Sequence, residues 1–144
     1  MRVNSIVHIN TERIRQLNEA AVRALEKTGE YLHTEVVQAE VVPRMDGALQ
    51  GESFSVNYSD SRNGKVSLIH STPYARRLYY HPEYRFRQEP WQEEVIRDGR
   101  VVTLSHDGNP NAKGKWYEDW LPGGKKENDC KKAFKKFYKE EGNL

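Results

Sequence analysis

The longest regular pattern of apolar positions lies in the first third of the chain. Apolar residues recur there at spacings of three and four over the stretch 14–39. This spacing places them on one face and predicts a long amphipathic helix over about residues 11–40. Gly29 is a weak point in that helix and predicts a kink, and Pro43 ends the pattern.

Short segments flank this helix on both sides. Residues 3–10 alternate in the manner of a short first strand. Asn10 or Thr11 follows it and can cap the helix. After the helix, Asp46 can begin a capped turn over residues 45–50.

The next part of the chain has the period of two that is typical of strands. Apolar and polar residues alternate over 54–58, and the segment 65–70 reads as a partner strand. Between them, residues 59–64 are rich in turn formers and end in Asn63-Gly64, which can supply positive φ. The pattern predicts an antiparallel pair.

A short helix follows directly. Thr72 is a plausible N-cap, and Pro73 then falls at the first helical position, where its missing N–H costs nothing. Pro82 disfavours helical geometry at His81 and ends the element after roughly two turns. The stretch 71–84 carries four tyrosines and two arginines. We expect Tyr and Arg at contact surfaces, since both are enriched there.

Some of these side chains are the candidate subunit interface. The alternative is that the helix is ordinary surface around a core formed by Tyr74 and Leu78, which are four residues apart. The interface candidates are Arg76, Arg77, Tyr79 and Tyr80.

Residues 87–115 form the least determined region. Alternation at 84–86 suggests another strand before it. Within it, 95–102 has the pattern of a small hairpin around Asp98-Gly99. Residues 105–114 are rich in Gly, Asn and Asp and read as loop. We predict a hairpin insertion or a mobile loop here.

The chain ends in a second amphipathic helix over about 126–140. Before it, residues 116–121 concentrate aromatic side chains, and a Pro-Gly-Gly break follows. Phe134 and Phe137 are predicted core residues of the helix. Its apolar stripe consists of Cys130, Ala133, Phe134, Phe137 and Tyr138.

These elements predict an α+β fold. We expect the long N-terminal helix and the C-terminal helix to pack on an antiparallel sheet of about four strands. The length of 144 residues is typical of one domain.

The composition is polar for this size. Hydrophobic residues make up 36% of the chain and charged residues 31%, with a net charge of +2. Either some segments become ordered only in an assembly, or the domain has a highly solvated surface. A single cysteine, Cys130, excludes an internal disulfide and a multi-cysteine metal site. No apolar run approaches the length of a membrane helix or a signal peptide, so we expect a cytoplasmic site of synthesis.

Candidate chemistry is sparse. The histidines show no zinc-ligand spacing, and no nucleophile, P-loop or dinucleotide motif is present. Glu118 and Asp119 lie beside Trp116 and Trp120, which could suggest a carboxylate site. Packed tryptophans with solvated acids are the favoured interpretation. A small hydrolase with a site assembled from distant loops stays open as an alternative.

The C-terminal helix also has a basic face. Residues 125–140 hold seven lysines against three acids. Such a face suits phosphate contacts, but lysines also commonly solvate a terminal helix, and aromatic residues that could stack on bases are absent from it. The candidate DNA contacts are Lys131, Lys132, Lys135 and Lys136.

Three segments together resemble a known family. They are residues 71–84, 42–50 and 109–120, the last containing Tyr117, Glu118 and Trp120 as an aromatic-acid-Trp pattern. In combination they are similar to the small neck, tail-completion or "minor capsid" proteins of long-tailed bacteriophages. The resemblance covers most of the chain from about residue 40 onward.

The resemblance implies a structural protein of the virion and no enzymatic activity or cofactor. We expect a subunit of a homo-oligomeric ring at the head–tail junction, in contact with other junction and tail proteins. Contact with packaged DNA stays open as a further interaction. Neck subunit, tail terminator and minor head component stay open. We expect a monomer or weak oligomer when purified, made in the host bacterial cytoplasm, with no membrane contact.

Overall fold

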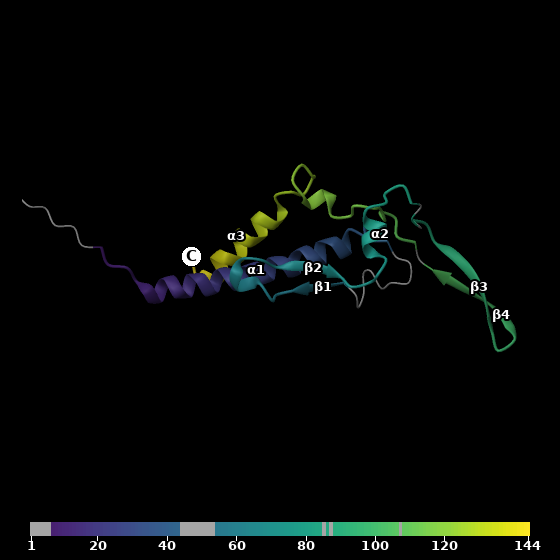
Figure 1. Ribbon diagram of the computed structural model, residues 1–144, viewed down its shortest axis with the longest axis horizontal. Helices are drawn as coiled ribbons and strands as arrows, with labels where there is room; N and C mark the ends of the chain where they lie inside the picture. The colour runs from purple at the N-terminus through teal and green to yellow at the C-terminus, as the bar shows by residue number, and fades with distance from the viewer. Residues whose placement is uncertain (1–6, 44–53, 85, 87, 107) are drawn as a thin grey trace, which may run out of the picture.

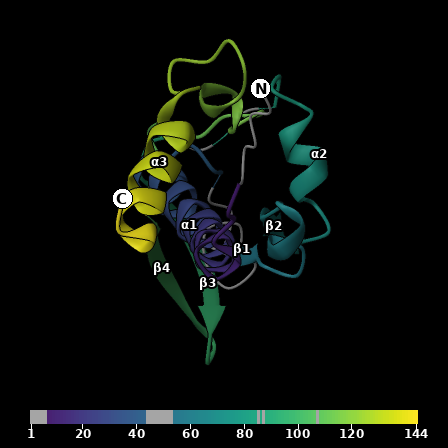
Figure 2. The ribbon, with the colours of Figure 1, turned by 90° about the vertical axis from the view of Figure 1, so that its left-hand side faces the viewer.

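The computed structural model of the chain describes residues 7–43, 54–84, 86, 88–106 and 108–144. In chain order the helices and strands are α1 (Thr11–Gln38), β1 (Phe54–Asn57), β2 (Ser67–His70), α2 (Ala75–Tyr79), β3 (Trp91–Arg97), β4 (Arg100–His106) and α3 (Asp129–Gly142). Short 3-10 turns cover Ser61–Asn63 (η1) and Glu118–Trp120 (η2). The predicted α+β class is confirmed. Figure 1 shows an elongated molecule built along α1, and Figure 2 places α1 between α3 and the β1–β2 pair.

Helix α1 begins where its cap predicts. The Asn10 side chain accepts a hydrogen bond from the Arg13 backbone N–H at 3.0 Å, which satisfies one of the free donors of the first turn. At the other end, the Ala39 N–H donates to the Glu35 carbonyl. The predicted strand over 3–10 falls partly outside the described residues, and residues 7–10 are not in a strand.

Gly29 does not interrupt α1, which is a single helix at this point. Instead it lets the β1–β2 pair approach the helix closely. A Cβ atom at Gly29 would lie 2.5 Å from Val66 Cγ1 and 3.1 Å from Val56 Cγ1. The glycine that suggested a kink is therefore a contact point between a helix and a sheet.

The first strand pair forms as predicted. Strands β1 and β2 are antiparallel, with Phe54 opposite His70 and Asn57 opposite Ser67. Gly64 closes the connection with φ 83°, a left-handed conformation that glycine adopts without strain. The Ser61 hydroxyl ties this turn to α1 through the Glu26 carboxylate at 2.8 Å.

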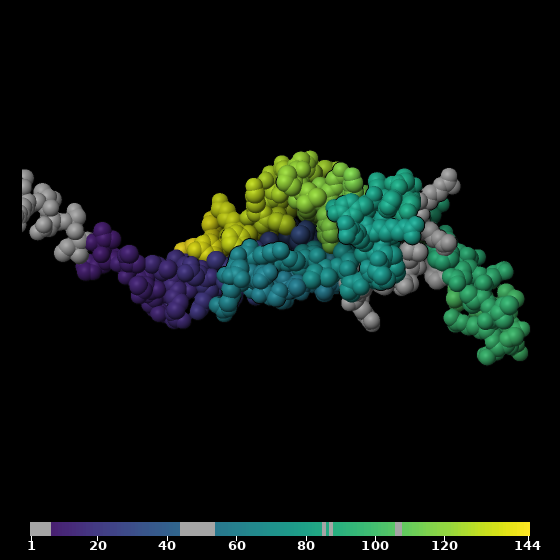
Figure 3. Space-filling model, in the orientation of Figure 1, coloured from purple at the N-terminus to yellow at the C-terminus, as the bar shows by residue number. Residues whose placement is uncertain are grey.

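The second strand pair is longer than predicted and separate from the first. Strands β3 and β4 pair antiparallel from Trp91 and His106 to Arg97 and Arg100, so the strands form two two-stranded sheets and not one larger sheet. Asp98 and Gly99 make the turn, with φ 52° and 74°. We call residues 91–106 the arm, because it projects from one end of the molecule (Figures 1 and 3). The strand predicted at 84–86 is absent, since neither Tyr84 nor Phe86 is in a strand.

Helix α2 begins later than Thr72 predicts. Its N-cap position is Tyr74, with no side-chain cap, and the helix starts at Ala75. Residues 72–75 form a turn instead, closed by the Ala75 N–H and the Thr72 carbonyl. The Thr72 hydroxyl is buried and has no hydrogen-bond partner among the described residues, so the predicted N-cap is wrong.

Helix α3 packs along α1, with its C-terminal end beside the first turns of α1. The Glu141 carboxylate pairs with Arg23 at 2.8 Å and with Lys27, and Arg13 donates to the Gly142 carbonyl at 2.6 Å. Ala133 is buried, whereas Phe134 and Phe137 are only half-buried. Both phenylalanines line open grooves beside α1, so their assignment as core residues is wrong.

The hydrophobic core lies at the opposite end of α1, around the start of α2. Trp116 and Trp120 are 1% and 7% exposed, which confirms that these tryptophans pack. The buried cluster consists of Val36, Val41, Val42, Phe54, Ala75, Trp116 and Trp120. The predicted capped turn at 45–50 lies outside the described residues.

Candidate interaction surface around helix α2

An aromatic cluster lies where β2 meets α2 and the Trp-rich segment. The His70 ring stacks on Phe54, with centroids 4.2 Å apart, and meets Trp116 edge-on at 5.4 Å. Tyr79 of α2 packs perpendicular to Trp116 at 4.8 Å. Edge-to-face and stacked aromatic pairs of this kind add to simple burial. The cluster therefore holds the short helix α2 against the core.

His70 acts as a hydrogen-bond acceptor within this cluster. Its Nε2 lies 2.5 Å from the Tyr117 hydroxyl and accepts from the Trp116 indole N–H at 3.4 Å. The indole N–H can only donate, so Nε2 is the unprotonated ring nitrogen and the Tyr117 hydroxyl donates to it. Burial raises the pKa of Tyr117, which keeps this hydroxyl protonated. Two donors directed at Nε2 require the neutral His70 tautomer with its hydrogen on Nδ1.

The outer side of the cluster is hollowed. The hollow has a volume of about 430 Å³, and Arg76 and Tyr80 stand at its rim. Tyr80 is 62% exposed. Arg76 is exposed and forms no ion pair or side-chain hydrogen bond within the described part of the chain. The hollow is lined by His70, Ala75, Arg76, Tyr79, Tyr80, Trp116 and Tyr117.

A second aromatic contact lies beside the hollow, at the end of α2. The Arg77 guanidinium donates to the Tyr84 hydroxyl at 3.2 Å and lies over the Tyr84 ring at 5.8 Å. The His81 ring also stacks on the Tyr84 ring, with centroids 4.7 Å apart. His81 also contacts the Glu83 carboxylate at 2.7 Å and lowers the pKa of that carboxyl. Arg77 is therefore held in place, although it is exposed.

The structure divides the predicted interface residues into two groups. Arg76 and Arg77 are exposed on α2 and Tyr80 is exposed directly after it, as an interface requires. Tyr79 faces inward and packs against the buried cluster. Its ring also contacts Tyr80 at 5.1 Å, so it positions an exposed side chain from within. We call Arg76, Arg77, Tyr80 and the hollow the α2 surface.

Residues 42–43, 71–84 and 109–120, the described parts of the three segments on which the resemblance rests, lie close together near this surface. Asn109 is buried and donates from Nδ2 to the Val42 carbonyl at 2.5 Å, and the Lys113 N–H donates to the Val41 carbonyl at 3.0 Å. Two residues later, the Lys115 N–H donates to the Tyr79 carbonyl at 2.8 Å. One segment thus connects the end of α1 to the end of α2.

The predicted DNA contacts lie on the outward face of α3, away from the α2 surface. These four lysines are exposed, and none forms an ion pair within the described residues. They are Lys131, Lys132, Lys135 and Lys136.

Other kinds of site have little support. Among the described residues, no three His, Cys, Asp or Glu side chains lie close enough together to hold a metal ion. Asp119, considered as a carboxylate beside tryptophans, pairs with Lys113 at 3.6 Å. No described helix combines the length and apolar character needed to cross a bilayer.

Comparisons with family models, curated proteins and solved structures found nothing that matches this chain.

Sequence reasoning missed two parts of this arrangement. His70 and Tyr117 are 47 positions apart, and their meeting at the hollow depends on tertiary packing. The exposed pair Ile96 and Val101 at the tip of the arm was also missed. Two branched apolar residues close to an Asp-Gly turn are a signal that could have found it.

Proposed function

We propose that this chain is a structural subunit at the head–tail junction of a tailed bacteriophage, where it works by protein–protein assembly without turnover. The α2 surface carries the proposal. An exposed tyrosine borders an aromatic hollow together with an arginine that has no acidic partner among the described residues, and this combination is typical of residues that dominate binding energy at interfaces.

The type of assembly that we propose is based on the resemblance of the three segments to phage neck and tail-completion proteins. This resemblance points to a ring subunit that contacts other junction and tail proteins. We assign the α2 surface to those contacts, because Arg76 lies in α2 and Tyr80 directly follows it, and Tyr79 between them packs on the core.

Particles made with and without the chain test this proposal. Without it, electron microscopy should show DNA-filled heads and free tails accumulating separately. Normal joining in its absence would contradict the proposed role.

A double replacement, Arg76→Ala with Tyr80→Ala, tests the surface itself. Both side chains are exposed, so the chain should stay folded while tails fail to attach. Lys125→Ala, a change at an exposed residue elsewhere, is the matched control and should leave joining unchanged. Joined particles from a folded double variant would exclude the α2 surface as the contact.

DNA contact through α3 is a second candidate function. The observation that favours it is the row of exposed lysines without acidic partners in the described chain. Replacing Lys131 and Lys135 with Glu should weaken DNA binding by the purified chain and reduce its dependence on salt. Equal binding by the variant and the native chain would reject this candidate.

A further inference from the structure

The arm is an unusual feature for a chain this small. Strands β3 and β4 pack extensively only on each other among the described elements, and Figure 3 shows them as a narrow projection. Strands of seven residues reach about 23 Å. A two-stranded hairpin alone is at best marginally stable in water, so such an arm is suited to being covered by a partner.

One face of the arm carries an apolar tip and an acid. Ile96 and Val101 are opposite each other in the pairing and are 78% and 68% exposed. Glu94 is two residues before Ile96 and therefore lies on the same face. It is exposed and has no ion-pair partner in the described residues. The face thus offers two branched apolar side chains next to a carboxylate.

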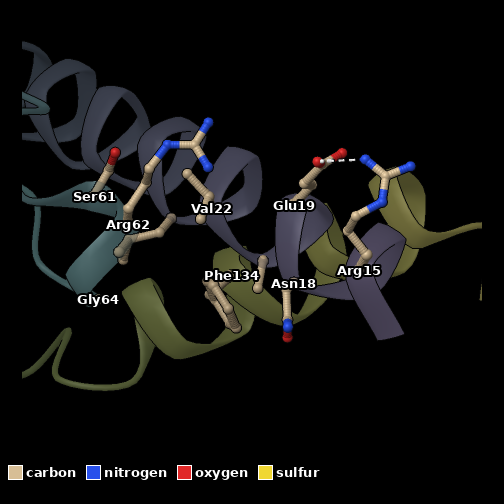
Figure 4. Close-up of a pocket in the computed structure, with 10 residues that line it drawn as sticks. Arg15, Asn18, Glu19, Val22, Ser61, Arg62, Gly64 and Phe134 are labelled. Atoms are coloured by element: carbon tan, nitrogen blue, oxygen red, sulfur yellow. Dashed lines mark hydrogen bonds and ion pairs between the residues drawn. The ribbon is translucent and has the colours of Figure 1, made fainter. Parts of the chain in front are cut away.

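A groove of complementary character lies between α1, α3 and η1. Its volume is about 550 Å³, and Figure 4 shows Val22 and Phe134 within it and Arg62 at its edge. Leu25 and Ala21 add to the apolar lining, while Asn18 and the mutually paired Arg15 and Glu19 line the far side of the groove from Arg62. Arg62 is exposed and has no ion-pair partner within the described chain. The groove therefore offers a half-buried apolar floor beside an uncompensated positive charge.

The arm cannot reach the groove of its own chain. Figure 1 places the arm at one end of the molecule and the N-terminal half of α1, which bears the groove, toward the other. A contact between them must join two copies. Because the two surfaces differ, the contact is head-to-tail, and its repetition closes a ring when the rotation per copy allows.

We propose that the arm of one copy docks in the α1–α3 groove of a second copy, with the apolar tip on the groove floor and Glu94 beside Arg62. The ring that this contact would build belongs to the proposed function, but the contact itself does not depend on it. The α2 surface stays free for other proteins of the junction.

Cross-linking between single-cysteine variants tests the contact in the purified full-length chain. Cys130→Ala provides a background without other cysteines. Copies with Ile96→Cys are mixed with copies with Val22→Cys and oxidised mildly over a range of concentrations. The mixed disulfide dimer should form at several times the yield of the control, Arg97→Cys with Val22→Cys. Arg97 is adjacent in sequence but on the opposite face of the arm. Equal yields from the two pairs would overturn the docking proposal.

Charge exchange then tests the predicted ion pair. Glu94→Arg and Arg62→Glu should each weaken self-association, measured by sedimentation equilibrium, by about twofold to fivefold, as expected for an exposed pair. A chain that carries both changes should self-associate as strongly as the native chain. A double variant as weak as the single ones would overturn the pairing. These measurements use no phage particles, so a failed docking proposal is distinguishable from a failed role at the head–tail junction.

Discussion

Thr72 and Thr28 carry the same side chain in two different settings. The Thr28 hydroxyl is buried and donates to the Ala24 carbonyl at 2.7 Å. The Thr72 hydroxyl is buried but has no hydrogen-bond partner in the part of the chain that the structure describes. A buried polar group without a hydrogen bond is destabilising, whereas a satisfied one is close to neutral or favourable. The two residues therefore allow the cost of the unpaired hydroxyl to be measured.

Replacing Thr72 with Val keeps the shape of the side chain and removes the unpaired hydroxyl. We expect the free energy of unfolding to be unchanged or to rise by up to about 1 kcal/mol. Thr28→Val is the matched control and should lower it by about 1 kcal/mol, since a hydrogen bond is lost. Denaturant unfolding measures both. A clear loss of stability in Thr72→Val would restore a capping role for the threonine.

At the scale of elements, the packing of α1 on the β1–β2 pair depends on Gly29. Alanine has the higher helix propensity and would stabilise an isolated helix by up to about 1 kcal/mol. Here its methyl group would meet Val66 and Val56 at distances that force the sheet to shift. Packing and propensity therefore act in opposite directions at this position.

We expect packing to dominate, so Gly29→Ala should destabilise the chain by about 1–3 kcal/mol. Thr34→Ala, at an exposed position of the same helix, is the control and should change stability little. Thermal or urea unfolding distinguishes the two. A stabilised Gly29→Ala variant would mean that the sheet does not press on the helix.

The contact between α1 and α3 includes a titratable group. Lys27 and then Arg23 hold the pKa of the Glu141 carboxyl below its usual range. A carboxyl with a lowered pKa in the folded state stabilises the fold above its unfolded pKa of about 4.3, and the effect is lost as pH falls through the folded value.

Glu141→Gln should therefore unfold at a lower temperature than the native chain at pH 7, and the difference should shrink as the pH is lowered below about 4. Glu19→Gln is the control, because its partner Arg15 lies on the same helix and the ion pair joins no second element. Melting curves at several pH values give the result. A difference that does not change with pH would exclude the ion pairs as its cause.

At the scale of the whole molecule, the arm lies apart from the hydrophobic core. The buried cluster lies around α2 and the end of α1, and it contains no residue of the arm. The Gln88 side chain, before the arm, donates to the Ala112 carbonyl at 3.0 Å and ties this end of the arm to the body. Shortening the arm beyond this anchor should leave the body intact.

Deleting residues 94–97 and 100–103 removes the outer part of the arm and retains the Asp98-Gly99 turn. The deletion removes an even number of residues from each strand, so each remaining side chain stays on the same face of the hairpin. We expect an unchanged unfolding midpoint and a loss of self-association. A destabilised body would show that the arm belongs to the folding unit.

The sequence alone determined the elements whose causes are local. A spacing of three and four residues and the cap at Asn10 place α1 nearly to its ends. Alternation and turn chemistry predict both hairpins, since Gly64 and Asp98-Gly99 supply the positive φ that their turns need. The exposed interface candidates Arg76, Arg77 and Tyr80 also came from local composition. Each of these signals depends on residues close together in the sequence, so the positions of helices and hairpins can be predicted without knowing the tertiary structure.

Tertiary structure decided everything that depends on distant partners. Local preference placed an N-cap at Thr72, but the chain forms a turn there and starts α2 at Ala75. The same packing turned Tyr79 inward and brought His70 to Tyr117, forming the hollow. It also left four strands as two separate hairpins, one of them an arm. The period of the apolar positions predicts which face of an element is apolar. The packing of the whole molecule decides which other element covers that face.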